Sequence, residues 1–240
     1  MKIIRVKDYN EMSKTAAELF FTKIKERPSL HLGLATGGTP VGMYEKLTEM
    51  LRSSTVSTGS LKIFNLDEYA GLPQNDPNSY FSFMKKHVYN PWGLKADQCF
   101  IPDGTAKNLE EECRRYEALL DEHGVDIQLL GAGENGHIGF NEPGTPFHSE
   151  THVEKLKNTT REANARFFPS LEEVPTHAVT MGISSILKAK EIVLIASGEA
   201  KAEAINSLVN SAMTEEWPIT ALQQHPEVTV IVDEAAAASI

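Results

Sequence analysis

A group of reactive side chains follows an apolar run in the second half of the sequence. The run Val125–Leu130 has the composition of a buried strand, and residues 131–144 then read GAGENGHIGFNEPG. Glycine lets the backbone approach a ligand closely, and α/β sheets bind ligands at the carboxyl ends of their strands. His137 and Glu142 are side chains of the types that transfer protons near neutral pH. The segment predicts a catalytic loop; the alternative is a glycine-rich turn with a solvated histidine.

A Gly-Gly turn lies between another apolar run and a helix-like segment. Gly37, Gly38 and Thr39 follow the strand-like run Leu30–Ala35, and Pro40 suits the first turn of a helix. The glycines let the backbone curl around an anion, and a helix N-terminus offers unpaired N–H groups and a positive dipole end. The pattern is neither GxGxxG nor a Walker A loop. It predicts a phosphate site, with a simple tight turn as the alternative.

Two adjacent carboxylates follow a third strand-like run, Leu61–Leu66. Asp67 and Glu68 stand at its carboxyl end, and an aromatic residue comes next. A carboxylate that is partly shielded by an aromatic ring is well placed to act as a general base. The alternatives are two solvated acids on a loop, or a metal site formed with His137 and Glu142. No HxxxH, Asp-x-Asp or Cys–His spacing supports the metal site, so we expect no metal.

Two cations in the later part of the chain stand beside polar loops. Arg166 lies in a polar stretch, and Lys201 follows the strand-like run Ile192–Ala196 and a Ser-Gly turn. Arginine pairs with phosphate through two hydrogen bonds, and lysine acts as a point charge. Most such side chains are merely solvated, so the pattern alone leaves the roles of both cations open.

The composition is typical of a globular protein with an acidic surface. The chain has 240 residues, with 23 Lys and Arg against 33 Asp and Glu, and a net charge of −10. This charge argues against nucleic acid or an anionic membrane as a partner, although a few local donors can still bind a small phosphate. The two cysteines stand in unrelated contexts and predict reduced thiols. With no signal peptide or membrane span, we expect a soluble, cytoplasmic protein.

Strand-like and helix-like patterns alternate along the whole chain. Further strands are expected at Ile3–Val6, His177–Thr180 and Val228–Val232, and helices at Asp8–Glu26, Val41–Leu51, Ser79–Val88, Asn108–Glu122 and Glu199–Val209. The alternation predicts one α/β domain over residues 1–240, with a mostly parallel sheet covered by helices on both faces. The more polar stretch 154–175 is expected to form a mobile lid over the pocket.

Together these motifs resemble the glucosamine-6-phosphate deaminase family. The resemblance is carried by ATGGTP at 35–40, NLDEY at 65–69 and GENGHIGFNEP at 133–143, and it continues in ANARFF at 163–168 and GEAKA at 198–202. It covers nearly the whole chain, in the right order. It implies a Rossmann-like three-layer αβα fold. It also implies conversion of D-glucosamine 6-phosphate and water to D-fructose 6-phosphate and ammonia, a step of amino sugar catabolism.

The resemblance also implies a role for each candidate catalytic residue. Asp67 would take the proton from C2 and return it at C1, and His137 would shuttle a proton from the anomeric hydroxyl to the ring oxygen. Glu142 would orient and polarise the imidazole. Asn135 stands where many members carry aspartate. An amide can hold an imidazole by a hydrogen bond but cannot stabilise its positive charge, so Glu142 would have to supply the charge.

The family's phosphate-binding positions also have counterparts in this chain. Gly38, Thr39, Arg166 and Lys201 match them, and Gly37 belongs to the same loop. No cofactor and no metal are implied, because the carbonyl of the substrate itself acts as the electron sink. The expected partner is a small sugar phosphate.

Two other functions on the same fold are alternatives. A sugar-phosphate lactonase shares the GGTP and GxGxxGH patterns, but usually carries Asp-Glu-Arg at the position of residues 67–69 and lacks the FNEP of residues 140–143. A sugar-phosphate-sensing regulator would need a helix-turn-helix and a basic surface. This chain starts with a strand-like segment and is acidic.

The sequence also bears on assembly and regulation. Some members of the family are hexamers that a phosphorylated N-acetyl amino sugar activates, held between subunits by basic side chains. The matching segment here carries His152 and Glu154, and a carboxylate repels a phosphate. The chain also lacks the C-terminal extension that completes such sites. We therefore expect hyperbolic kinetics and either a monomer or an oligomer smaller than a hexamer.

Overall fold

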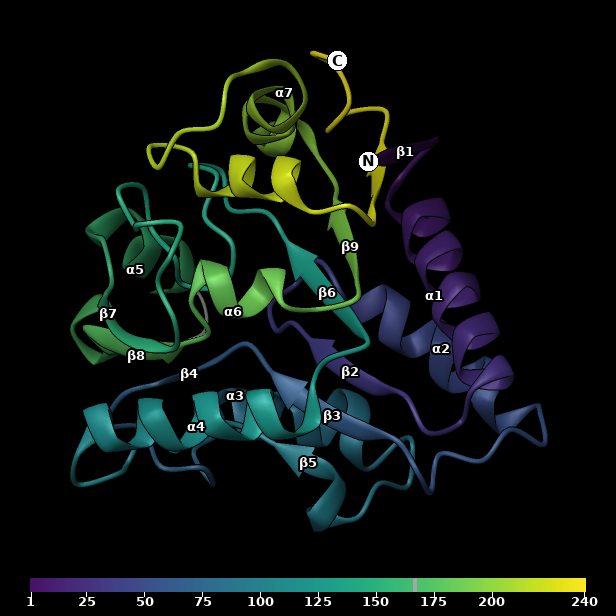
Figure 1. Cartoon of the computed structure of the whole chain (residues 1–240), viewed down its shortest axis with the longest axis horizontal. Helices are drawn as coiled ribbons and strands as arrows, with labels where there is room; N and C mark the ends of the chain where they lie inside the picture. The colour runs from purple at the N-terminus through teal and green to yellow at the C-terminus, as the bar shows by residue number, and fades with distance from the viewer. Residues whose placement is uncertain (166–167) are drawn as a thin grey trace.

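The computed structural model describes residues 1–165 and 168–240, and over these residues a seven-stranded parallel sheet forms the centre of the molecule (Figure 1). In spatial order the strands are β1 (Lys2–Val6), β10 (Val228–Asp233), β9 (Glu191–Ala196), β6 (Ile127–Gly131), β2 (His31–Leu34), β3 (Lys62–Asn65) and β5 (Cys99–Phe100). All recorded pairings between these strands are parallel. Six of these strands correspond to apolar runs of the sequence, as expected, whereas the two-residue strand β5 was not predicted.

Helices cover both faces of the sheet, which gives the expected three-layer αβα arrangement. On one face lie α1 (Tyr9–Glu26) and α2 (Val41–Arg52), and on the other α4 (Leu109–His123), α6 (Ile183–Leu187) and α7 (Ala202–Asn210). Consecutive side chains along a strand point to opposite faces of the sheet. Leu129 therefore packs with α1 and α2, whereas Leu130 packs with α4, α6 and α7. Both faces of the strands are therefore buried, as the continuous apolar runs indicate.

Capping residues fix where several helices begin. Asp8 accepts a hydrogen bond from the backbone N–H of Glu11 and starts α1, and Asn108 starts α4 in the same way. The helix expected over Ser79–Val88 is in fact shorter: α3 (Tyr80–Met84) passes into a π-helical turn over Lys85–Tyr89. Val88 and Tyr89, the last two residues of this wider turn, are both buried.

A second, antiparallel sheet of three strands lies within the described residues beside the first, and the sequence patterns did not predict it. It contains β4 (Asp67–Tyr69), β8 (His177–Thr180) and β7 (His152–Lys155), in that spatial order. The run His177–Thr180, expected in the main sheet, pairs here instead, with Thr180 opposite Asp67. This small sheet places Asp67 beyond the carboxyl end of β3. From β7 the chain continues into α5 (Asn158–Asn164), which lies next to the small sheet (Figure 1).

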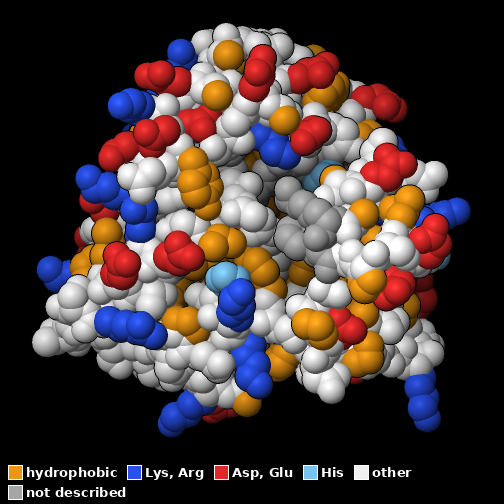
Figure 2. Space-filling model, turned by 180° about the vertical axis from the view of Figure 1, so that it is seen from behind, with side chains coloured by type: hydrophobic (Ala, Val, Ile, Leu, Met, Phe, Trp, Pro, Cys, Tyr) orange, Lys and Arg blue, Asp and Glu red, His pale blue; other side chains and the backbone are white. Residues whose placement is uncertain are grey.

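The surface carries charges of both signs. On the face in Figure 2, acidic and basic side chains are interspersed. Of the helices in the described part of the chain, none has the length and apolar character needed to cross a membrane.

Candidate active site

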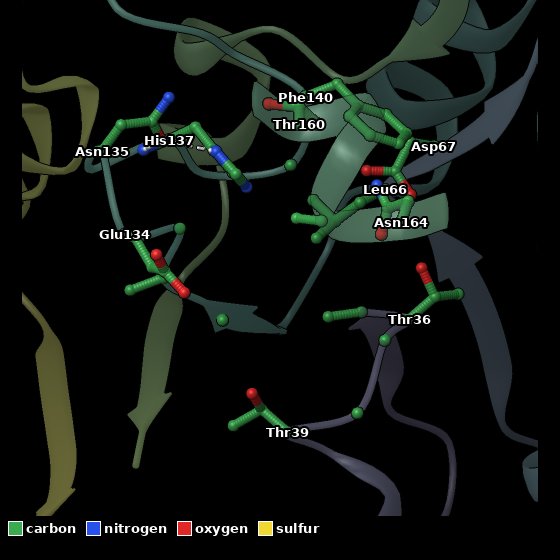
Figure 3. A pocket seen from close by; sticks show the side chains of 18 of the residues that line it. Thr36, Thr39, Leu66, Asp67, Glu134, Asn135, His137, Phe140, Thr160 and Asn164 are labelled. Atoms are coloured by element: carbon green, nitrogen blue, oxygen red, sulfur yellow. Dashed lines mark hydrogen bonds between the residues drawn. The ribbon is translucent and has the colours of Figure 1, made fainter. Parts of the chain in front are cut away.

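A cavity of about 730 Å³ opens at the carboxyl ends of β2, β3 and β6 (Figure 3). Although β3 follows β2 in the chain, β6 lies on the other side of β2, so the order of strands reverses here. Open α/β sheets bind ligands at such switch points. The volume lies within the range of pockets that hold small molecules. The cavity therefore has the position and size of a binding site for a small metabolite.

The Gly-Gly loop forms one end of the cavity. Gly37 has a φ of +98°, a conformation that favours glycine, and the loop leads directly into α2. The hydroxyl-bearing side chain of Thr39 points into the cavity (Figure 3). Tyr9 of α1 supports the loop, because its hydroxyl donates to the carbonyl of Gly38 (3.3 Å) and accepts from the N–H of Gly42 (2.9 Å). Sequence reasoning missed Tyr9, since a tyrosine at the start of a helix carries no signal for such a role.

Lys201 adds a cation to the same cavity. It ends the 3-10 turn Glu199–Lys201 that follows β9, and it lines the cavity together with Gly37, Gly38 and Thr39. Its side chain is 21% exposed, and its Nζ lies 4.0 Å from Oε1 of the exposed Glu134. The structure thus brings together all the predicted phosphate-binding residues except Arg166, which lies outside the described residues.

Asp67 presents a buried carboxylate to the cavity. It is 6% exposed, and its side chain points into the cavity from the start of β4 (Figure 3). Burial, together with the neighbouring charge of Glu68, raises the pKa of Asp67 to about 8. A carboxyl group with a pKa near the working pH suits proton transfer to and from carbon.

Glu68 is directed away from the cavity and into the protein. It is 1% exposed, and its carboxylate accepts hydrogen bonds from the backbone N–H groups of Tyr69 (2.8 Å), Tyr80 (3.0 Å) and Phe81 (2.9 Å). Burial nevertheless outweighs these bonds and raises the pKa of Glu68 to about 7. Glu68 therefore anchors the start of α3. Within the described residues, no group of three or more His, Cys, Asp or Glu side chains is placed to hold a metal ion.

Asn135 connects His137 to Glu142. Its Oδ1 accepts from Nδ1 of His137 (2.7 Å), and its Nδ2 donates to Oε2 of Glu142 (3.0 Å). The direct distance from His137 Nδ1 to Glu142 Oε2 is 4.0 Å. The expectation that Glu142 itself orients the imidazole therefore needs refinement, because Glu142 orients the amide and the amide orients the ring.

This arrangement determines which nitrogen of the neutral imidazole carries the proton. Because Asn135 gives its amide hydrogen to Glu142, its carbonyl oxygen faces His137 and can only accept. Nδ1 is therefore protonated, and Nε2 is left with a lone pair. Burial lowers the pKa of His137; Glu142 and Glu134 oppose this effect, and Lys201 adds to it. The imidazole is thus disposed to accept a proton at Nε2.

Gly133 makes room for the imidazole. A Cβ at this position would lie 2.2 Å from Nδ1 of His137, so no other residue fits without moving the ring. The backbone N–H of Gly133 also donates to the carbonyl of His137 (2.9 Å), which closes the loop. The glycine is required by close packing against the site.

The segment expected as a lid contributes one wall of the cavity through α5. Thr159, Thr160, Ala163 and Asn164 line it. Thr160, which is 6% exposed, also donates a hydrogen bond to Oε1 of Glu142. No motif in the sequence indicated Thr160, because a threonine in a polar helix resembles many solvated ones.

The chain is similar to known proteins over its whole length. A family model described as glucosamine-6-phosphate isomerases/6-phosphogluconolactonase matches residues 7–231. The glucosamine-6-phosphate deaminase of Halalkalibacterium halodurans is 51% identical over 237 residues, which cover 98% of this chain and 96% of the relative. Glucosamine-6-phosphate deaminase 1 of Bacillus subtilis is 50% identical over 99% of this chain and 98% of its own length.

Solved structures give the same result for the fold. A structure described as a monomeric glucosamine-6-phosphate deaminase superposes with a TM-score of 0.97 and 49% identity, and all of both chains is covered. The 6-phosphogluconolactonase from Leishmania guyanensis superposes with a TM-score of 0.79 at 22% identity, covering 100% of this chain and 98% of that one. At this lower identity the likeness shows a common fold.

Proposed function

The chain belongs to the glucosamine-6-phosphate isomerase/6-phosphogluconolactonase family, and from this premise we propose that it is a glucosamine-6-phosphate deaminase. It converts D-glucosamine 6-phosphate and water to D-fructose 6-phosphate and ammonia. Relatives of this name share about half of the residues over nearly the full length. The observation that carries the proposal is the cavity itself, which Asp67, His137 and the Gly-Gly loop line together.

The phosphate of the substrate binds at the end of the cavity formed by the Gly-Gly loop. Backbone N–H groups, the Thr39 hydroxyl and the positive end of α2 face it, and Lys201 supplies a cation. Glu134 lies next to this cation and has to give way to the phosphate or share Lys201 with it. Arg166 is proposed as a further phosphate ligand from the sequence resemblance alone.

His137 opens the sugar ring. Its Nε2 takes the proton of the anomeric hydroxyl and delivers a proton to the ring oxygen as the C1–O5 bond breaks, which leaves an aldehyde at C1. Asn135 and Glu142 hold the imidazole in the tautomer that this step requires. The positive charge that develops on the ring is stabilised by Glu142 through the intervening amide.

Asp67 moves the carbon-bound proton. Its carboxylate takes the proton from C2 while the C1 oxygen takes a proton from the ammonium group at C2, which gives an enolamine. Asp67 then returns its proton to C1, which leaves a hydroxyl at C1 and an iminium group at C2. Water then adds to C2, and ammonia leaves as the ketone forms. The ammonium group of the substrate is a cation close to Asp67, so it favours the ionised carboxylate that the first step needs. Because water cleaves a C–N bond overall, we class the enzyme as a hydrolase.

We further propose that the protein acts as a monomer in the cytoplasm. The monomeric state is supported by the similarity to a structure described as a monomeric deaminase. The cytoplasmic location is supported by the phosphorylated substrate, which does not cross a lipid bilayer by itself because of its charge.

Ammonia release from glucosamine 6-phosphate tests the function directly, with 6-phosphogluconolactone hydrolysis as the comparison. Asp67→Asn should lower kcat by about 10²–10⁴-fold, the range for a general base. Binding of the substrate should persist in this variant, because the phosphate loop is untouched. Hydrolysis of the lactone without ammonia release would overturn the proposal. A variant that keeps more than about a third of kcat would remove Asp67 from the mechanism.

A further inference from the structure

The carboxylate of Glu142 is held by donors from two different parts of the chain. Asn135, in the same loop, donates to Oε2 (3.0 Å), and Thr160 of α5 donates to Oε1. Glu142 is 2% exposed, so water offers little replacement for either bond. The backbone of Glu142 is fixed separately, because its carbonyl accepts from the N–H (3.0 Å) and hydroxyl (2.7 Å) of Thr145. The position of the carboxylate therefore depends on Asn135 and Thr160.

Thr160 belongs to the element that forms one wall of the cavity. It follows Thr159 and precedes Ala163 and Asn164, all of which line the cavity. The next residue, Arg161, donates to the carbonyls of Leu171 (2.8 Å) and Val174 (3.0 Å), so α5 is bonded to the segment that follows it. The bond from Thr160 to Glu142 thus joins the wall of the cavity to the hydrogen-bonded chain that ends at His137.

Loss of this bond would change the charge that His137 experiences. Without the Thr160 hydroxyl, Oε1 of Glu142 is left without this donor in a buried position, which is unfavourable for a carboxylate. A donor close to this carboxylate is Nδ1 of His137, 4.0 Å from Oε2. An imidazole that bonds directly to a carboxylate is more easily protonated than one that bonds to an amide oxygen. The other charged groups facing the ring are Lys201 and Glu134, and Asp67 lies across the cavity.

We propose that Thr160 is a positioning residue that couples the placement of α5 to the protonation state of His137. With α5 in the position seen here, Thr160 holds Glu142 against Asn135, and His137 stays neutral with Nε2 able to accept the anomeric proton. With α5 displaced, the carboxylate of Glu142 is released toward the imidazole, its charge favours uptake of a proton from solvent by the ring, and ring opening slows. The kinetic part of this inference rests on the proposed deaminase function, whereas the state of the imidazole does not.

The kinetic test compares three variants. Thr160→Val removes the hydroxyl at nearly constant volume, Thr160→Ser keeps it, and Thr22→Val makes the same change at an exposed position of α1 outside the cavity lining. We expect Thr160→Val to lower kcat about 10-fold with a smaller change in KM, since a small misplacement of a catalytic group can cost up to about 100-fold. The acid limb of kcat/KM should move to higher pH. Thr160→Ser should restore the wild-type acid limb, and Thr22→Val should leave it unchanged.

The second test needs no catalysis. The ¹⁵N shifts of the His137 ring nitrogens in the ligand-free protein report the tautomer and the pKa, and the spectrum of His137→Gln identifies them. We expect a neutral, Nδ1-protonated ring in the wild type and a raised pKa in Thr160→Val, with Thr160→Ala as a second variant if the valine does not fit. A folded Thr160 variant with wild-type shifts and pH limb would overturn the coupling. Absence of ammonia release by the wild type would overturn the deaminase function and leave this test standing.

Discussion

Burial of Asp67 sets the acidity of the group that is proposed to move the carbon-bound proton. The side chain stands at the start of a short strand in the small sheet and is almost closed off from water. In this position the charged form is disfavoured, and the pKa rises to about 8 from an ordinary value of 3.8. The same burial that suits proton transfer also lowers the free energy of unfolding, because the charged carboxylate is disfavoured in the folded protein.

Replacing Asp67 by asparagine should therefore stabilise the folded protein. Below the pKa of the unfolded chain the acid is neutral in both states. As the pH rises, the unfolded carboxyl ionises first, so the wild type loses stability up to the folded pKa of about 8. Asp67→Asn removes this loss, and its free energy of unfolding should exceed that of the wild type by about 5 kcal/mol at pH 8, since the pKa rises by about four units and one unit corresponds to 1.36 kcal/mol.

Urea unfolding at pH 4.5 and pH 8 would measure this difference, which should be much smaller at the lower pH. Asp97→Asn changes an exposed carboxyl group and is the matched control, with no comparable gain expected. An Asp67→Asn protein no more stable than the wild type at pH 8 would show that the carboxyl is ionised in the folded state.

Asn135 offers a second test at the scale of single residues. In Asn135→Asp an oxygen replaces the Nδ2 that now lies 3.0 Å from Oε2 of Glu142. Two carboxylates at this distance repel each other unless they share a proton. The added negative charge beside His137 should raise the imidazole pKa and move the acid limb of kcat/KM to higher pH. The pH dependence of kcat/KM checks this, with Thr160→Ser as a conservative control; an unchanged limb would separate residue 135 from the histidine.

At the scale of elements, the main sheet was predictable and the small sheet was not. The apolar runs Leu30–Ala35 and Val125–Leu130 predicted buried strands, and the polar residues after them predicted the site, because parallel strands place their carboxyl ends at one edge. In contrast, β4 has only three residues, and its partner β8 lies far away in the sequence. A strand of that length has no periodicity to detect. The contact between α5 and the catalytic loop was equally hidden, since the bond from α5 to Glu142 comes from a single threonine hydroxyl.

Glu68 shows how an element end can depend on one buried side chain. Its carboxylate accepts from Tyr69, Tyr80 and Phe81, and Glu68→Ala would leave these N–H groups without that acceptor. We expect a loss of about 2–4 kcal/mol in the free energy of unfolding, since each unsatisfied buried donor costs about 1–3 kcal/mol. Urea denaturation measures this, and Glu45→Ala, at an exposed position of α2, should change stability by less than about 0.5 kcal/mol. An equally small change for Glu68→Ala would show that α3 begins without this cap.

At the scale of the whole molecule, the fold gathers distant segments at one edge of the sheet. The loops after β2, β6 and β9 and the start of β4 meet around the cavity, and α5 closes one side. The small sheet links these parts, because β4 carries Asp67 at one edge while β7, at the other edge, leads into α5. A displacement of β7 would therefore move α5, which lines the cavity. This makes the charges on β7 relevant to regulation.

The charges on β7 predict an enzyme that a phosphorylated N-acetyl amino sugar does not activate. Nε2 of His152 lies 3.1 Å from Oε2 of Glu154, and although burial opposes it, this hydrogen bond raises the pKa of His152. The pair is thus close to neutral overall when the histidine is protonated and negative when it is not, so it attracts a phosphate in neither state. We expect hyperbolic rate curves for glucosamine 6-phosphate and a mass in solution near the 26.5 kDa of one chain.

Rate curves with and without N-acetylglucosamine 6-phosphate, together with light scattering under assay conditions, measure both properties. Glu154→Lys is an informative control, because it replaces the repelling carboxylate with a cation at the same position. If this variant gains binding of the N-acetyl compound without activation, the charge on β7 governs binding alone, and coupling to the cavity requires contacts that a single chain does not make. Sigmoidal curves that the N-acetyl compound makes hyperbolic in the wild type would contradict the prediction, whatever the mass in solution.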